Sequence, residues 1–76
     1  MTTVAEKLDT RGMSCPLPIL KTRKAINLIN SGEILEVTAS DPGSVKDMAT
    51  FCQQPGNRLV SSNEADSNFV FLIEKA

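Results

Sequence analysis

Two cysteines, Cys15 and Cys52, are the side chains of this sequence best suited to covalent chemistry. The 76 residues include no histidine, which excludes Ser–His and Cys–His catalytic pairs and histidine-ligated metals within the chain. Two cysteines are also too few for a structural zinc site, which takes four Cys or His ligands. Any reaction must therefore use a thiolate, a carboxylate, Lys or Arg, or depend on groups that a partner supplies.

The more informative cysteine opens the stretch Cys15-Pro16-Leu17-Pro18. Prolines are tolerated in the first turn of a helix, so we expect a helix over residues 15–30 with Cys15 at the N-cap and Pro16 at the first helical position. The positive end of the helix dipole favours a thiolate there and lowers its pKa. Gly12 permits a close approach of the backbone just before the cysteine. A purely structural Cys15 is the weaker alternative, because cysteine is a poor N-cap.

Cys52 stands in a different pattern. Val45, Met48, Ala49 and Cys52 recur at helical spacing in a second expected helix, over residues 44–54, whose start approximates a capping box from Ser44 to Asp47. This stripe predicts that Cys52 is a small core residue, as free cysteines commonly are. There is no Cys-x-x-Cys motif, so a dithiol mechanism has no local resolving partner.

The elements that must position Cys15 follow from apolar periodicity. Residues Ile19, Thr22, Ile26 and Ile29 define one buried stripe on the first helix, and Leu35, Val37 and Ala39 define one face of a strand. We expect the order β-α-β-α-β-β over residues 4–9, 15–30, 33–40, 44–54, 58–62 and 68–74, in a single domain of residues 1–76.

This order predicts an α/β fold of the α+β type: a two-layer sandwich with a four-stranded mixed sheet and both helices on one face. If the first two strands are parallel neighbours, residues 12–15 and 41–43 leave the same edge of the sheet and lie close together in space.

Charge is unevenly distributed along the chain, although the formal net charge is -1. Arg11, Lys21, Arg23 and Lys24 give residues 10–32 a charge of +4 without any acid, whereas residues 33–76 carry -4. The pattern predicts a local basic face, with chance scatter in a short chain as the alternative.

The outer side of the first helix combines this charge with leucines. Leu17, Lys21, Lys24 and Leu28 fall on one stripe, with Leu20 nearby, and we expect a docking surface there. The alternative is a solvated face with incidental leucines. Phe51 lies off the main stripe of the second helix and either extends this surface or packs at the edge of the core.

The N-terminus lacks the basic and apolar segments of a secretory signal, and no apolar run approaches the roughly 20 residues that span a bilayer. We therefore expect a cytoplasmic protein with reduced thiols.

The string Leu8-Asp9-x-x-Gly12-x-x-Cys15-Pro16-x-Pro18, followed by Arg23-Lys24, Asp41-Pro42 and Phe51-Cys52, resembles the TusA/SirA family of small sulfur carrier proteins. The resemblance implies a βαβαββ sandwich in which Cys15 carries sulfane sulfur as a covalent persulfide, with no other cofactor and no metal. It implies a sulfur-donor protein (a cysteine desulfurase or a rhodanese-like protein) and an acceptor relay protein, for tRNA 2-thiouridine formation or dissimilatory sulfur oxidation.

The same reasoning assigns roles to the neighbours of Cys15. We expect Gly12, Pro16 and Pro18 to position the motif. Partner contacts are expected from Leu17, Leu20, Lys21, Arg23, Lys24, Asp41 and Phe51.

Two other functions stay open on the sequence. One is a regulatory or RNA-binding module that uses the basic face, although only three Phe are available for stacking on bases. The other is a thiol redox sensor, since an acidic exposed thiol is also a site of oxidation. We expect a monomer, because a carrier must expose one sulfur atom to successive proteins. We expect no direct nucleic-acid binding, because the net charge of -1 is not basic, and no membrane contact.

Overall fold

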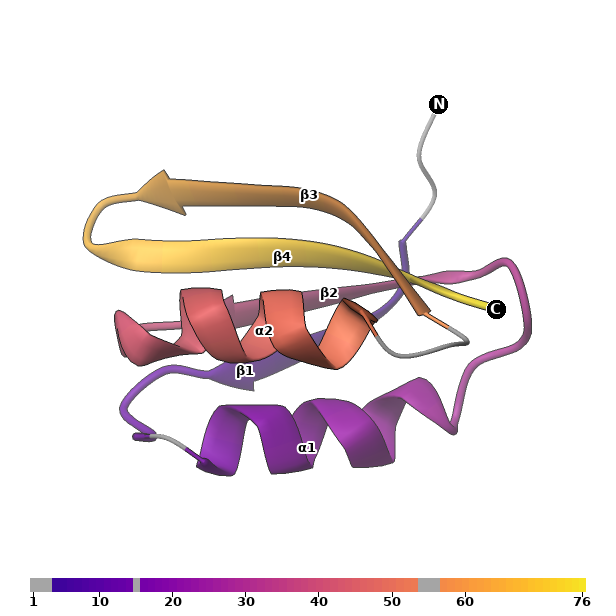
Figure 1. The fold of residues 1–76 in the computed structure, drawn as a ribbon, viewed down its shortest axis with the longest axis horizontal. Coiled ribbons are helices and arrows are strands. Elements are labelled where there is room, and N and C mark those ends of the chain that lie inside the picture. The colour runs from indigo at the N-terminus through magenta and orange to yellow at the C-terminus, as the bar shows by residue number, and fades with distance from the viewer. Residues whose placement is uncertain (1–3, 15, 54–56) are drawn as a thin grey trace.

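The computed structural model describes residues 4–14, 16–53 and 57–76. Two helices cover one face of a four-stranded sheet, so the molecule has two layers (Figure 1). The predicted β-α-β-α-β-β order and α+β fold are confirmed. The elements are β1 (Val4–Thr10), α1 (Leu17–Ile26), β2 (Ile34–Ala39), α2 (Gly43–Gln53), β3 (Asn57–Ala65) and β4 (Asn68–Lys75).

The strand order in the sheet is β1-β2-β4-β3. Strands β1 and β2 are parallel, and β4 pairs antiparallel with both β2 and β3. The apolar run of β4 therefore lies in the interior of the sheet, as predicted. The β3–β4 hairpin closes through Asp66 and Ser67, which have φ of 51° and 66°. Positive φ at both turn residues matches the twist of a two-residue hairpin, which lets β3 extend beyond the expected residues 58–62.

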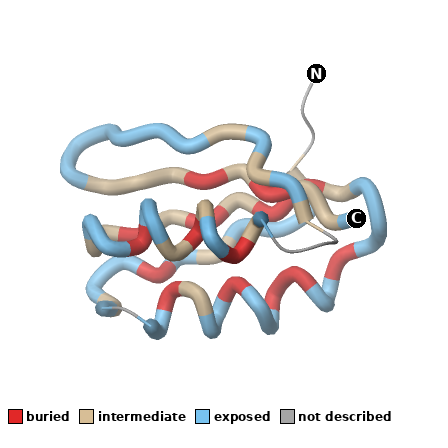
Figure 2. The backbone as a smooth tube through the Cα atoms, in the orientation of Figure 1, coloured by how far each residue is buried: buried red, intermediate tan, exposed pale blue. Residues whose placement is uncertain are grey.

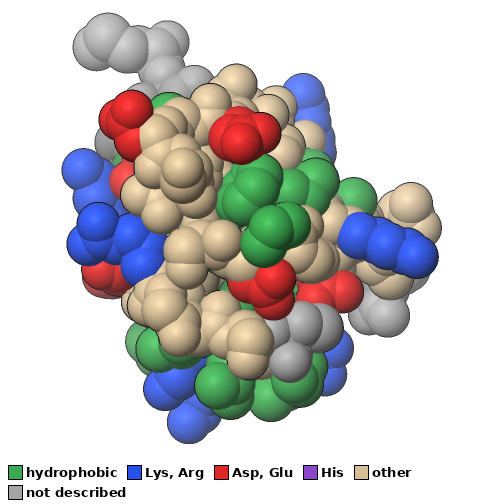
Figure 3. Space-filling model, turned by 90° about the vertical axis from the view of Figure 1, so that its left-hand side faces the viewer, with side chains coloured by type: hydrophobic (Ala, Val, Ile, Leu, Met, Phe, Trp, Pro, Cys, Tyr) green, Lys and Arg blue, Asp and Glu red, His purple; other side chains and the backbone are tan. Residues whose placement is uncertain are grey.

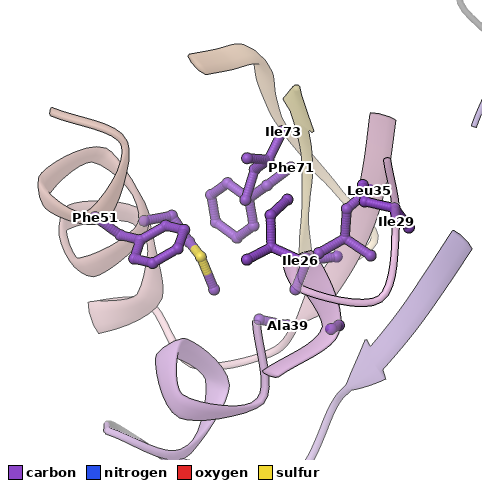
Figure 4. Packing of buried hydrophobic residues seen from close by; sticks show 10 residues of the cluster. Ile26, Ile29, Leu35, Ala39, Phe51, Phe71 and Ile73 are labelled. Carbon is purple, nitrogen blue, oxygen red and sulfur yellow. The ribbon is translucent and has the colours of Figure 1, made fainter. Parts of the chain in front are cut away.

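The core lies between the helices and the sheet, where Figure 2 shows the buried positions gathering. Phe51 of α2 and Ile26 of α1 point towards Phe71 on β4 (Figure 4). Alternate residues of β2 face the same layer, because side chains alternate across a strand. The fully buried apolar side chains of the described residues include Pro18, Leu35, Val37, Ala39, Met48, Phe71 and Ile73.

Helix α1 buries the predicted stripe, with Thr22, Ala25 and Ile26 inside and Ile19 half-buried. The buried Thr22 hydroxyl donates to the Pro18 carbonyl at 2.8 Å, which satisfies it within the helix. The helix ends at Ile26, four residues earlier than expected, because the next N–H groups, of Asn27 and Leu28, bond three residues back, to Lys24 and Ala25.

Strand β4 is hydrogen-bonded to the segment that follows α1. The Lys75 ammonium donates to the Ile29 carbonyl at 2.8 Å, and the Gly32 N–H donates to the Lys75 carbonyl at 2.6 Å. These two bonds hold the α1–β2 connection against β4, at the opposite end of α1 from Cys15.

The buried side of α2 includes Met48, as predicted, but is otherwise displaced by about one residue from the predicted stripe. Ser44, Met48 and Phe51 are buried, whereas Val45 is 38% exposed and Cys52 is half-buried. The buried Ser44 hydroxyl is satisfied because it donates to the Asp41 carbonyl at 2.6 Å. A polar side chain can therefore occupy a core position that hydrophobic periodicity does not predict.

The start of α2 also differs from the capping box expected at Ser44. The helix begins at Gly43, whose N–H donates to the Asp41 carboxylate at 3.1 Å. The capping role therefore falls on Asp41, which the sequence had suggested as a partner contact.

Candidate functional site

The candidate site lies where β1 and β2 end and both helices begin, at the left of Figure 1. The Gly12 N–H donates to the Ser40 hydroxyl at 2.8 Å, which joins the loop after β1 to the residue that follows β2. The prediction that these two connections are neighbours is confirmed for Gly12. Cys15 itself lies outside the described residues, so the site is built from the residues on either side of it.

A tight turn over residues 10–13 leads into the motif. The Met13 N–H donates to the Thr10 carbonyl at 3.2 Å, and Gly12 has a φ of 82°. A Cβ added at Gly12 would meet no heavy atom within 4 Å. The expected close approach of backbone at Gly12 is therefore wrong, and glycine is required by the left-handed conformation instead. The buried Thr10 hydroxyl donates to the Thr38 carbonyl at 2.7 Å and holds the turn against β2.

An ion pair braces the outer side of this turn. Two guanidinium nitrogens of Arg11 lie 2.9 Å from the two carboxylate oxygens of Asp9, and the Arg11 N–H donates to the same carboxylate at 3.0 Å. The Arg11 side chain, then its backbone N–H, lowers the pKa of Asp9 to about 2, and the pair raises the pKa of Arg11. Residues i and i+2 at a strand end share one face, so the spacing of Asp9 and Arg11 is the signal that predicts this pair.

Helix α1 begins one residue later than predicted. Pro16 is the N-cap, Leu17 is the first helical residue and Pro18 is the second, with no side-chain cap. The Leu17 N–H donates to the Ser14 carbonyl at 2.9 Å, which ties the start of α1 to the loop after β1. The N-cap assignment of Cys15 is wrong, since a proline that precedes Leu17-Pro18 takes that place. Cys15 still directly precedes the capping residue of α1.

The outer face of α1, defined as Leu17, Leu20, Lys21 and Lys24 together with Leu28 just beyond the end of the helix, is exposed. Leu17 and Leu20 are each 46% exposed, and Leu28 is 81% exposed. Hydrophobic and basic side chains lie side by side over the lower part of Figure 3, where α1 runs. The predicted exposure of these residues is confirmed, and their role as partner contacts stays a prediction.

Two of the other three expected contact residues, Phe51 and Asp41, are less accessible. Phe51 is only 8% exposed and belongs to the edge of the core, which settles the alternative that the sequence left open. Asp41 is half-buried and caps α2.

An open groove of about 220 Å³ runs between α1 and α2 beside Pro16. The Arg23 guanidinium carbon lies 6.0 Å from the centre of the Phe51 ring, at the limit of a cation–π contact. Arg23 therefore faces this groove, apart from the outer face of α1. Helix α2 contributes groove residues that were not predicted from the sequence. Lys46 and Thr50 share one helix face at i, i+4 spacing, which is the signal that could have identified them. The groove is lined by Pro16, Ile19, Arg23, Lys46, Asp47, Thr50 and Phe51.

The second cysteine has the properties of a core residue. Cys52 is a free thiol that packs against the hydrophobic cluster, and burial raises its pKa. A thiol of this kind is a poor nucleophile at neutral pH. The prediction that Cys52 packs in the core is therefore confirmed, even though the core stripe of α2 is shifted.

Two further properties concern the described part of the chain. Within residues 4–14, 16–53 and 57–76, no three Cys, Asp or Glu side chains gather closely enough to hold a metal ion. Neither helix has the length and apolar character needed to cross a membrane.

A β-α-β-α-β-β sandwich with a Cys-Pro-x-Pro stretch at the start of its first helix defines a class of small thiol-bearing proteins. The family model described as sulfurtransferase TusA matches residues 6–75. The chain belongs to the TusA family.

Curated relatives are similar along nearly their whole length. The sulfur carrier protein TusA of Allochromatium vinosum is 49% identical over 71 residues, which cover 93% of each chain. A provisionally named sulfur carrier protein of Neisseria meningitidis is 39% identical over 92% of this chain and 95% of its own. Another from Bacillus subtilis is 38% identical over 90% of this chain and 91% of its own.

Proposed function

We propose that this protein is a sulfur carrier that holds sulfane sulfur as a persulfide on Cys15 and relays it between proteins. The observation that carries the proposal is the placement of Cys15-Pro16-Leu17-Pro18 at the start of α1 in a chain 49% identical to a named sulfur carrier. The half-buried Cys52 takes no part in the transfer.

The proposed step is a thiolate displacement on a donor persulfide. The Cys15 thiolate attacks the outer sulfur of the donor, and the new S–S bond forms as the S–S bond of the donor breaks. The donor leaves as a thiolate, and Cys15 becomes the persulfide without any external oxidant or reductant. In the second transfer, an acceptor thiolate attacks the outer sulfur of the Cys15 persulfide, and Cys15 leaves as a thiolate.

The position of Cys15 explains why no histidine base is needed. It directly precedes the N-cap of α1, where the helix dipole favours negative charge, and the first turn holds no acidic residue. Lys21 and Lys24 add a weaker positive field from the exposed side of the same helix. A thiol that is already acidic becomes a nucleophile by losing its proton to solvent.

The outer face of α1 supplies the proposed docking surface. Its exposed leucines contribute apolar contact area, and its lysines favour an acidic patch on the partner. A cysteine desulfurase or a rhodanese-like protein would supply the sulfur, and a relay protein would accept it, for tRNA 2-thiouridine formation or sulfur oxidation. The reducing cytoplasm would keep the carrier thiol available between transfers.

Mass spectrometry tests this function directly. The protein is incubated with a cysteine desulfurase and cysteine, or with rhodanese and thiosulfate. One reducible sulfur atom is expected on the wild type and on Cys52→Ser, and none on Cys15→Ser. Loading that survives in Cys15→Ser contradicts the assignment.

The RNA-binding alternative is disfavoured by the positions of the phenylalanines. Phe51 and Phe71 are buried and Phe69 is half-buried, so none offers an open ring on which a base could stack. A salt titration of tRNA binding compares the wild type with a Lys21→Ala/Arg23→Ala/Lys24→Ala variant. We expect negligible binding by both, whereas wild-type binding that the triple substitution abolishes would restore the alternative.

A further inference from the structure

Ser40 directly follows the last residue of β2, and its hydroxyl accepts the Gly12 N–H at 2.8 Å. We propose that Ser40 is a positioning residue for Cys15: it fixes the turn from which the chain enters the Cys-Pro-x-Pro motif. The proposal rests on the sulfur-carrier function but concerns a residue outside the motif and 28 positions away from Gly12 along the chain.

The path from β1 to α1 is short, so its direction depends on few contacts. Gly12 stands three residues before Cys15, in a left-handed conformation with a φ of 82°. The Met13 N–H bonds back to Thr10, and the Leu17 N–H bonds back to Ser14, which gives each side of the motif a local turn. The first bond ties the loop to β1, as the Arg11–Asp9 pair also does, and the second ties Ser14 to α1, but neither reaches the end of β2. The Ser40 bond does so.

The buried Thr10 bond alone does not do this work. The Thr10 hydroxyl fixes the end of β1 against Thr38, whereas Gly12, Arg11 and Ser14 are exposed. The Met13 bond to Thr10 and the Arg11–Asp9 pair hold the start of the loop to β1, and none of these contacts fixes the loop relative to the residue that follows β2. The Ser40 hydroxyl meets the loop at Gly12, on the side of β2.

Loss of this bond should affect reactivity more than folding. Gly12 is exposed, so water can replace the hydroxyl as acceptor for its N–H, and the core is untouched. The loop, however, gains alternative positions. Because nucleophilic attack needs a defined approach, a misplacement of about 1 Å can cost up to a hundredfold in rate.

The test compares Ser40→Ala with Ser40→Thr, which keeps a hydroxyl, and with the matched control Ser62→Ala on the exposed part of β3. All variants carry Cys52→Ser, so that Cys15 is the single thiol. Alkylation by iodoacetamide across a pH series gives the pKa of Cys15 and the rate of its thiolate. Loading from a desulfurase with cysteine, at varied donor concentration, gives kcat and KM separately.

We expect Ser40→Ala to lower kcat for loading by about tenfold with KM little changed, and to alter the pH profile of alkylation. Ser40→Thr should restore both, and Ser62→Ala should match the parent. Urea denaturation identifies any variant that fails to fold. A wild-type kcat and pH profile in folded Ser40→Ala, or failure of Ser40→Thr to restore them, overturns the proposal.

The two proposals fail in different ways. If the parent protein does not load sulfur at all, the carrier function is wrong. Alkylation requires no partner protein, so an altered profile in Ser40→Ala still supports the positioning role of Ser40. If the parent loads and Ser40→Ala loads equally well, only the role of Ser40 is wrong.

Discussion

Gly12 and Gly32 both have a left-handed backbone conformation, but only Gly12 lies next to the candidate site. Alanine substitutions at the two positions therefore separate the effect of backbone strain on stability from its effect on sulfur loading. Gly12 has a φ of 82° next to the candidate site, and Gly32 has a φ of 85° in the α1–β2 connection at the far end of α1. At both positions an added Cβ would meet no heavy atom within 4 Å. Replacement by alanine therefore adds strain to the backbone without a steric clash.

The expected loss of stability follows from two opposing effects. A left-handed conformation costs an L-residue roughly 1–2 kcal/mol. Alanine also restricts the unfolded chain, which offsets roughly 0.4–1 kcal/mol of that cost. Gly12→Ala and Gly32→Ala should each lower the free energy of unfolding by about 1 kcal/mol, or the melting temperature by about 4–8 °C for a domain of this size.

The assay is urea denaturation of both variants, followed by sulfur loading under saturating donor. We expect equal losses of stability but slower loading only in Gly12→Ala, because Gly32 is remote from the motif. Asparagine tolerates the left-handed region better than alanine does, so Gly12→Asn should recover part of both losses. Unchanged stability in both alanine variants would refute the strain argument, and equal slowing of loading in both would refute the special position of Gly12.

Three further predictions concern packing and electrostatics. Lys75→Met removes the 2.8 Å bond to the Ile29 carbonyl and should cost about 1–2 kcal/mol in urea denaturation, with loading unchanged. Met48→Ala should cost about 2–5 kcal/mol, whereas Val45→Ala should cost under about 1 kcal/mol because Val45 is 38% exposed; the reverse order would contradict the register of α2. The carboxylate of Asp9 has a pKa lowered to about 2, so its contribution to stability is complete above its unfolded pKa of about 4 and disappears as the pH falls through 2. Asp9→Asn should therefore flatten the acid limb of a stability–pH curve, and an NMR titration that gives Asp9 an ordinary pKa would contradict this.

The fold was predictable because its elements carry strong periodic signals. The alternation of Leu35, Val37 and Ala39 and the apolar run of β4 are direct consequences of one-sided and interior burial. The order of elements then leaves few topologies, so the meeting of the β1–α1 and β2–α2 connections followed from the sequence as well.

The errors occurred where a polar contact overrides hydrophobic periodicity. Ser44 is buried with its hydroxyl satisfied by the Asp41 carbonyl, and the core side of α2 is formed by Ser44, Met48 and Phe51. A hydropathy pattern assigns the same place to Val45. The start of α1 was predicted one residue too early for a different reason. Sequence rules for capping assume a side-chain acceptor, and Pro16 caps the helix without one.

The site was predictable only in part. The residue types identify Cys15 and its prolines as a candidate site. The spacing of the leucines and lysines predicts the exposed face of α1. The Ser40–Gly12 bond and the contribution of Lys46 to the interhelical groove depend on tertiary contacts between residues far apart in the chain. A serine that follows a strand has no local signature that distinguishes this role.

Mass spectrometry of the loaded protein shows directly whether Cys15 carries the sulfur. Intact and peptide mass spectrometry after incubation with a cysteine desulfurase and cysteine locates the added sulfur atom. The account predicts one reducible sulfur on the peptide that contains Cys15, its persistence in Cys52→Ser and its loss in Cys15→Ser. Sulfur found on Cys52, or loading that is unaffected in Cys15→Ser, would contradict it.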